Sequence, residues 1–198
     1  MKIPKIIKKL GFWCIHPRYA FNRAKDNRFR KKNPEAPWLT EDAIIIIEEL
    51  AKKDWFCFEW GSGRSTVWFA NRIEKIVSLE HDEVWFNKIS NVLETNEIHN
   101  VKHKLAKISE FEESHISKPI FNDYTDAILH FPDQSFDCIL VDGRNRNACL
   151  VNAIPKLKSG GYLILDNAER SYDVSSLSDW KLIKTTNGIW NTFIWEKP

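Results

Sequence analysis

Short apolar runs recur along the chain, and each of four runs is followed by an acidic residue. They are Trp55–Phe58 before Glu59, Ile76–Leu79 before Glu80, Cys138–Val141 before Asp142, and Tyr162–Leu165 before Asp166 and Asn167. Continuous apolar runs of this length are typical of strands covered on both faces, as in a parallel sheet. Because the carboxyl ends of such strands meet at one edge of the sheet, we expect these polar residues to mark a site there.

The remaining patterns predict helices between the strands. Thr40 is a suitable N-cap, and the run Ile44–Ile47 predicts that the helix it begins is largely buried. Residues 81–95 are predicted to form a helix and Val101–Leu105 a further strand. The segment from Leu157 to Gly161 is interpreted as a helix end followed by a Gly-Gly turn into the last parallel strand.

The C-terminal residues predict a hairpin. Two strand-like runs, Trp180–Thr185 and Trp190–Glu196, flank the dipeptide Asn187-Gly188, which is a strong turn signal between strands. Together the patterns predict an α/β fold, a doubly wound and mostly parallel sheet closed by a C-terminal antiparallel β-hairpin.

A glycine loop separates the first strand from the helix after it. Gly61 and Gly63 follow Glu59 with one residue between each pair, which lets bare backbone approach a ligand. A dinucleotide fingerprint requires a third glycine where Thr66 stands, so that motif is incomplete. Glu80 lies 19 residues after Gly61, close to the spacing at which nucleotide-binding folds place a ribose-binding acid.

With its acid-x-Gly-x-Gly loop, the chain resembles the class I S-adenosylmethionine-dependent methyltransferases. The resemblance spans roughly residues 38 to 196 and rests on the loop Trp60–Thr66 (WGSGRST), on the segment Leu157–Gly161 (LKSGG) before an apolar strand, and on the terminal hairpin. It implies a Rossmann-like fold with S-adenosylmethionine as the methyl donor. The residues that it implies for donor binding are Glu59, Gly61, Ser62, Gly63, Ser65, Thr66, Glu80, His81 and Asp142.

Asp142, Asp166 and Asn167 leave two mechanisms open. They resemble the metal triad of catechol-type O-methyltransferases, which implies Mg²⁺ bound by three oxygen ligands. Those enzymes often carry a lysine soon after the first aspartate, whereas Arg144 and Arg146 stand here. The alternative is that Asp142 or Asp166 acts as a general base while the arginines anchor an acidic acceptor.

The absence of two sequence motifs narrows the choice of group that accepts the methyl. The Asp-Pro-Pro-aromatic type of motif used for amino groups of nucleic acid bases is absent after the fourth strand, and the chain contains no Pro-Cys dipeptide of the cytosine C5 type. We therefore expect O-methylation of a small-molecule, lipid-linked or sugar acceptor. An NAD-type oxidoreductase and a non-catalytic Rossmann-like binding module are the alternatives.

Charge is concentrated at the N-terminus. Residues 1–33 carry eleven Lys and Arg against one acid, Asp26, whereas the rest of the chain has a formal charge of −8. Ile3, Ile6, Ile7 and Leu10 have helical spacing, which predicts a basic amphipathic helix. We predict a basic extension over residues 1–36 and a methyltransferase domain over residues 37–198. Residues 1–15 are expected to lie on an anionic membrane, to pack on the domain or to remain a loose arm; nucleic acid is disfavoured, since no base-reading motif accompanies the charge.

Composition is that of an ordinary globular domain, with 43% hydrophobic and 28% charged residues in 198. None of the four cysteines forms a Cys-x-x-Cys pair, and the nine tryptophans are interpreted mainly as core residues. No apolar stretch is long enough to span a bilayer. These features predict a cytoplasmic protein, with peripheral membrane contact as the alternative.

Overall fold

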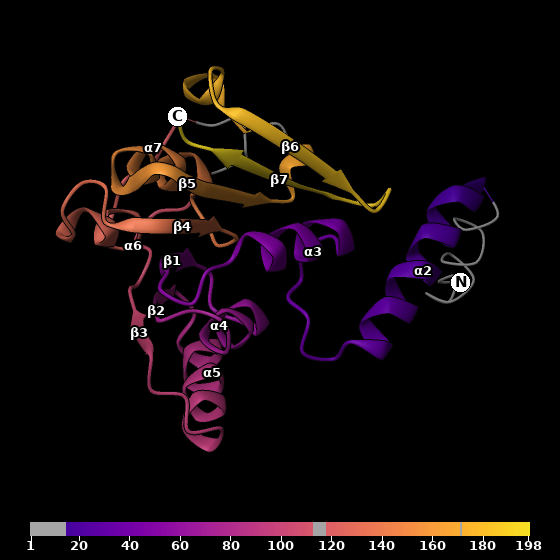
Figure 1. The fold of residues 1–198 in the computed structure, drawn as a ribbon, viewed down its shortest axis with the longest axis horizontal. Coiled ribbons are helices and arrows are strands. Elements are labelled where there is room, and N and C mark those ends of the chain that lie inside the picture. Colours follow the sequence, from indigo (N-terminus) through magenta and orange to yellow (C-terminus); the bar gives the residue numbers. More distant parts are fainter. Residues whose placement is uncertain (1–14, 113–117, 171) are drawn as a thin grey trace, which may run out of the picture.

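Seven strands form one sheet in the order β3-β2-β1-β4-β5-β7-β6. The computed structural model describes residues 15–112, 118–170 and 172–198 (Figure 1). The strands are β1 (Phe56–Trp60), β2 (Lys75–Glu80), β3 (Val101–Leu105), β4 (Phe136–Val141), β5 (Leu157–Asp166), β6 (Lys181–Thr186) and β7 (Asn191–Glu196). The first five are parallel, and β7 pairs antiparallel with both β5 and β6. The predicted fold class is therefore confirmed.

Helices cover both faces of the sheet (Figure 1). One face packs against α3 (Glu41–Leu50) and α4 (Arg64–Ala70), while α5 (Glu83–Thr95) contacts β2 and β3. The other face packs against α6 (Asp123–Asp126) and α7 (Arg146–Lys156). Short 3-10 turns occupy Ala127–His130, Ala168–Arg170 and Ser175–Leu177. Apolar side chains that alternate along each buried strand fill two cores, one on either side of the sheet.

Two local predictions need correction. The Gly160-Gly161 dipeptide lies inside β5 instead of preceding it, and the pairing with β4 shifts register there, between Phe136 and Cys138. Thr40 stands at the N-cap of α3, but its hydroxyl does not cap the helix. It lies 2.5 Å from the Thr185 hydroxyl of β6 and so ties α3 to the terminal hairpin. Within α3, Ile44 and Ile47 are buried as expected, whereas Ile45 is exposed.

The basic N-terminal region contains a helix, α2 (Pro17–Lys32), which the sequence did not predict. Arg30 of this helix is buried, and its guanidinium donates to Asp26 Oδ2 at 3.1 Å and to the carbonyl oxygens of Pro37 and Leu39 at 3.0 and 3.1 Å. The guanidinium also lies 4.2 Å from the ring centre of Trp38. A buried arginine that satisfies four groups at once fixes α2 against the segment before α3.

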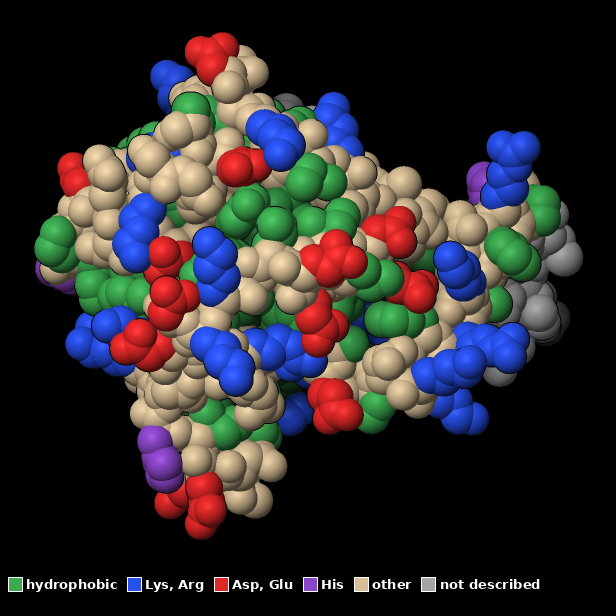
Figure 2. All heavy atoms as spheres, viewed as in Figure 1, with side chains coloured by type: hydrophobic (Ala, Val, Ile, Leu, Met, Phe, Trp, Pro, Cys, Tyr) green, Lys and Arg blue, Asp and Glu red, His purple; other side chains and the backbone are tan. Residues whose placement is uncertain are grey.

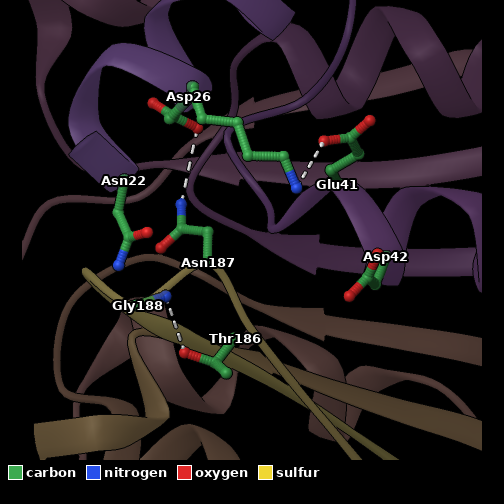
Figure 3. Close-up of a pocket in the computed structure, with 8 residues that line it drawn as sticks. Asn22, Asp26, Glu41, Asp42, Thr186, Asn187 and Gly188 are labelled. Atoms are coloured by element: carbon green, nitrogen blue, oxygen red, sulfur yellow. Dashed lines mark hydrogen bonds and ion pairs between the residues drawn. The ribbon is translucent and has the colours of Figure 1, made fainter. Parts of the chain in front are cut away.

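The same helix contacts the turn of the β6–β7 hairpin. The side chains at this contact point toward one another in Figure 3, where Asp26 accepts from the Asn187 amide at 3.4 Å. Gly188 has φ +74°, and a Cβ there would lie 2.0 Å from the Asn22 side chain, so only glycine fits beneath the helix. In the described part of the chain α2 therefore packs on the β6–β7 hairpin. The amphipathic segment predicted before Ile15 lies outside the described residues.

The outward face of α2 is strongly basic. Lys and Arg side chains gather around this helix in Figure 2, and the exposed ones include Arg18, Lys25, Arg28, Lys31 and Lys32. Its acid, Asp26, is buried beside Arg30. No helix within the described ranges has the length and apolar character needed to cross a membrane.

Replacing Arg30 by methionine should loosen α2 selectively. The substitution removes the nearest cation of the buried Asp26 and two hydrogen bonds to residues 37–39. We expect amide hydrogen exchange within α2 to accelerate by about tenfold or more, because charge-assisted hydrogen bonds each contribute roughly 1.5–3 kcal/mol. Arg28→Met, on the exposed face of the same helix, is the matched control and should leave exchange unchanged. Equal protection in the two variants would contradict the docking role of Arg30.

Candidate functional site

A pocket of about 510 Å³ opens at the carboxyl edge of the parallel strands. We call it the strand-end pocket. Its walls come from the loops after β1, β2, β4 and β5, and two of the four strand-end acids, Glu80 and Asp142, line it. The lining residues are Gly61, Ser62, Glu80, His81, Asp82, Val84, Trp85, Asp142, Gly143, Arg144, Arg146, Asn167 and Arg170.

The glycine loop is held against the end of β4. Gly61 has φ +94°, and a Cβ at this position would lie 2.9 Å from backbone atoms of Gly143. The amide of Gly61 donates to the Leu79 carbonyl at 2.8 Å. Both glycines therefore allow two backbones to touch, and a side chain at residue 61 would separate them. Gly63 differs, because a Cβ there would point into open space.

Glu59 lies beneath this loop and does not line the strand-end pocket. Its side chain is fully buried, and it accepts hydrogen bonds from Ser65 at 2.9 Å, from Ser78 at 2.6 Å and from Thr66. Burial raises the pKa of Glu59 to about 7, although the three hydroxyl groups act in the opposite direction. The contacts assign Glu59 to holding the loop, in place of the direct contact with the donor expected from the sequence.

Thr66 belongs to the same buried group. Its hydroxyl accepts from the Gly63 amide at 2.9 Å and donates to Glu59, and its side chain has no exposed surface. Ser65 lies between this network and a neighbouring pocket that it helps to line. Of the loop residues expected to bind the donor, Gly61 and Ser62 line the strand-end pocket, while Thr66 lies behind it.

Glu80 ends β2 with its carboxylate at the pocket wall. Oε1 accepts from the backbone amides of His81 and Asp82 at 2.7 and 2.9 Å. Burial raises the pKa of Glu80, but the side chain of His81 and these two amides lower it on balance. The other oxygen, Oε2, accepts from the Ser62 hydroxyl at 3.2 Å. His81 also lines the pocket, with Nδ1 2.8 Å from Oε1. Glu80 is thus ionised, firmly oriented and able to accept further hydrogen bonds through Oε2.

Arg146 connects the ends of β4 and β5. It donates to the Asp142 carboxylate at 3.0 Å, to the carbonyl oxygens of Asp142 and Gly143 at 2.9 Å, and to the Asp166 carbonyl at 2.5 Å. Burial raises the pKa of Asp142, and the charge of Arg146 counteracts this effect. The Asp142 side chain remains 26% exposed, so it is accessible from the pocket while paired with Arg146. Arg144 lines the pocket and is exposed.

Asp166 points away from the strand-end pocket. Its carboxyl accepts from the Thr192 hydroxyl of β7 at 2.8 Å, and Asp166 is missing from the pocket lining, whereas Asn167 is part of it. Burial, followed by the negative charge of Asp142, raises the pKa of Asp166 to about 8. A carboxyl that is neutral at pH 7 and bonded to a hydroxyl is a weak ligand for a hard cation. Within the described ranges, no cluster of three His, Cys, Asp or Glu side chains has the geometry of a metal site.

Sequence reasoning missed several lining residues. Trp85 donates through Nε1 to the Ser62 carbonyl at 2.7 Å and so closes one side of the loop. Arg170 lines the pocket from the turn after β5. The interpretation of tryptophans as core residues holds for Trp55, Trp60, Trp68 and Trp195. It does not hold for the half-exposed Trp85 and Trp38. Trp85 could have been recognised from the sequence, because it stands in the first turn of the helix that follows Glu80.

The strand order and the pocket at the strand ends define a Rossmann-like nucleotide-binding type of domain. The profile of a methyltransferase-domain family matches residues 58–168, more than half of the chain. The chain therefore belongs to this family of class I S-adenosylmethionine-dependent methyltransferases. A search of curated protein sequences found no significant match.

Solved structures share the fold at low sequence identity. A methyltransferase-like protein from Silicibacter pomeroyi aligns with a TM-score of 0.60 and 20% identity, over 82% of this chain and 89% of that one. A Streptococcus mutans protein described as a methyltransferase, in complex with S-adenosylhomocysteine, gives 0.59 and 12%, over 78% and 94%. An rRNA methylase from Streptococcus thermophilus gives 0.57 and 14%, over 77% and 92%. At these identities the likeness establishes the fold alone.

Glu59→Gln should flatten the pH dependence of stability. Because the pKa of Glu59 is raised in the folded state to about 7 from an ordinary 4.5, the stability of the neutral form is present below pH 4.5 and is lost as the pH rises through 7. We expect urea unfolding between pH 5 and pH 8 to show a fall in the free energy of unfolding that is roughly 2 to 3 kcal/mol smaller in the variant than in the wild type. Glu49→Gln, at an exposed glutamate of α3, should keep the whole fall. Identical pH profiles for wild type and Glu59→Gln would refute this assignment.

Proposed function

We propose that the protein transfers the methyl group of S-adenosylmethionine to a hydroxyl oxygen of a small-molecule, lipid-linked or sugar acceptor. The observation that carries the proposal is the position of two acids on one pocket, Glu80 at the end of β2 and Asp142 at the end of β4. Glu80 suits binding of the methyl donor, and Asp142 suits deprotonation of the acceptor. The glycine loop after β1 leaves room for a ligand to lie across the ends of these strands.

The pocket residues fit the donor. Glu80 Oε2 accepts only a long hydrogen bond from Ser62, which leaves acceptor capacity for the vicinal hydroxyls of a ribose. The backbone at Gly61 and the open space beside Gly63 allow close approach of the amino acid part. We assign His81 to the adenosine side of the site and Ser62 to the orientation of Glu80, while Glu59, Ser65 and Thr66 hold the loop in shape.

The reaction needs little more than alignment and a base. The sulfonium of the donor supplies an activated methyl group, so most of the rate enhancement comes from holding the acceptor oxygen in line with it. Asp142 lies at the pocket surface with a pKa raised by burial, which suits a carboxylate that must accept a proton near neutral pH. In the proposed step the acceptor oxygen bonds to the methyl carbon, the carbon–sulfur bond breaks, and Asp142 takes the hydroxyl proton.

Arginines at the rim have different parts in this proposal. Arg144 is permanently charged and makes a poor base, so we assign it to orienting the reacting oxygen beside Asp142. Arg146 is a positioning residue, because its hydrogen bonds are used by the ends of β4 and β5. The metal alternative is disfavoured by the donor set: Asp166 faces Thr192, and its pKa of about 8 keeps it neutral. The proposed reaction therefore uses no Mg²⁺.

Two further proposals concern a membrane surface and the class of the acceptor. Contact of residues 1–15 with an anionic membrane is consistent with the basic outward face of α2, which begins immediately after them. Nucleic acid is a known acceptor of one structural relative, the rRNA methylase. We retain a small-molecule acceptor, because the two motifs for methylation of nucleic acid bases considered above are absent from the sequence. A cytoplasmic location is proposed on the buried free thiols of Cys57, Cys138 and Cys149.

Calorimetric binding of S-adenosylmethionine and S-adenosylhomocysteine tests the donor assignment. We expect micromolar binding by the wild type and about 10- to 100-fold weaker binding by Glu80→Ala, because two hydrogen bonds to a charged group are lost. Glu83→Ala, an exposed acid at the start of α5, is the control. NAD serves as the comparison ligand: binding of NAD with no binding of either sulfur compound by a folded wild type would replace the methyltransferase proposal by the oxidoreductase alternative.

A further inference from the structure

A second pocket of about 680 Å³ adjoins the strand-end pocket. We call it the side pocket. The two share Gly61, Ser62, Trp85 and Asp142, so a ligand in the side pocket reaches the proposed base from the opposite side of the glycine loop. Its remaining lining residues come from α4, from α5 and from the segment before α3; they are Glu35, Trp38, Gly63, Arg64, Ser65, Val67, Lys88, Ile89 and Val92.

The walls of the side pocket are mainly apolar. Val67 of α4 and Ile89 and Val92 of α5 line it, together with the rings of Trp38 and Trp85. Both rings are more than 40% exposed, at 50% and 41%. Leaving large aromatic surfaces in contact with water is unfavourable, and neighbouring exposed aromatics of this kind mark sites that bind apolar ligands.

Two cations lie over these rings. The guanidinium of Arg64 lies 5.5 Å from the ring centre of Trp38, and the ammonium of Lys88 lies 4.3 Å from that of Trp85. Among the described residues, neither cation has a carboxylate within ion-pair distance. The pocket thus combines an apolar interior with two cations that lie over aromatic rings and form no ion pair with the two carboxylates, Glu35 and Asp142, that also line it.

We propose that the side pocket is the acceptor site, and that the acceptor has an apolar body and an anionic group. The inference rests on the proposed methyl transfer and gives it a substrate class. The apolar body lies between α4 and α5, and the anion lies near Arg64 and Lys88. The acceptor hydroxyl then approaches Asp142 at the junction with the strand-end pocket, which is left to the donor. The volume falls within the range of about 300 to 1,000 Å³ that is usual for small-molecule sites.

A matched pair of probes tests the two features separately. Anilinonaphthalenesulfonate has an aromatic body with a sulfonate, and phenylnaphthylamine is the same body without the charge. Fluorescence titration is carried out on the full-length protein saturated with S-adenosylhomocysteine. We expect the anionic probe to bind about tenfold more tightly than the neutral one, since the charges of Arg64 and Lys88 attract the sulfonate.

Three variants locate the binding. Lys88→Gln and Arg64→Gln should each weaken the anionic probe by about threefold or more and leave the neutral probe unchanged. Val92→Trp fills the apolar interior and should abolish binding of both probes. Lys53→Gln, at an exposed lysine outside both pockets, is the control and should change neither affinity.

Binding of S-adenosylhomocysteine, measured by calorimetry on the same variants, separates this inference from the donor assignment. Unchanged affinity for S-adenosylhomocysteine together with altered probe binding supports an acceptor site. Weaker affinity for S-adenosylhomocysteine in Val92→Trp would assign the side pocket to the donor and overturn the inference. Equal binding of both probes by the wild type, or no effect of Lys88→Gln and Arg64→Gln, would overturn the anionic class. Failure of the wild type to bind S-adenosylhomocysteine would instead refute the donor assignment.

Discussion

The buried carboxyl of Glu59 is the interaction on which the geometry of the site depends. It lies at the end of β1, opposite Ser78 of β2 in the strand register, and accepts hydrogen bonds from Ser78 and from two hydroxyls at the start of α4. One side chain therefore connects two strands and the helix after the glycine loop. Because burial of the ionised form is costly, this network is stable only when all its hydroxyls are in place. The shape of the glycine loop therefore depends on these hydrogen bonds.

A second network, centred on Arg146, fixes the opposite half of the site. Its guanidinium donates hydrogen bonds to the carbonyl oxygens at the ends of β4 and β5 and to the carboxylate of Asp142. The two networks meet where Gly61 touches Gly143. The contact allows no side chain at residue 61. Glu80 and Asp142, which belong to different strands, line the pocket on either side of this contact.

Much of the fold could be predicted from the sequence because burial on two faces produces continuous apolar runs. β2 and β4 end at or one residue after the ends of those runs, and the Asn187-Gly188 turn predicted the terminal hairpin. The side on which a polar residue lies could not be predicted in the same way. Glu59 and Asp166 stand at the ends of their strands as expected, but cross-strand partners, Ser78 and Thr192, turn both away from the pocket. Those partners become neighbours only after the sheet has formed.

The docking of α2 shows why the basic extension cannot be treated as separate from the site. Its charge pattern indicates a surface for anions, yet the one arginine that is buried, Arg30, stacks on Trp38 and binds the carbonyl oxygens beside it. Trp38 is also a wall of the side pocket. A single aromatic ring therefore has Arg30 of the extension and Arg64 of the catalytic domain near its π system. Loss of the helix would free this ring, so the extension helps to shape the pocket that we assign to the acceptor.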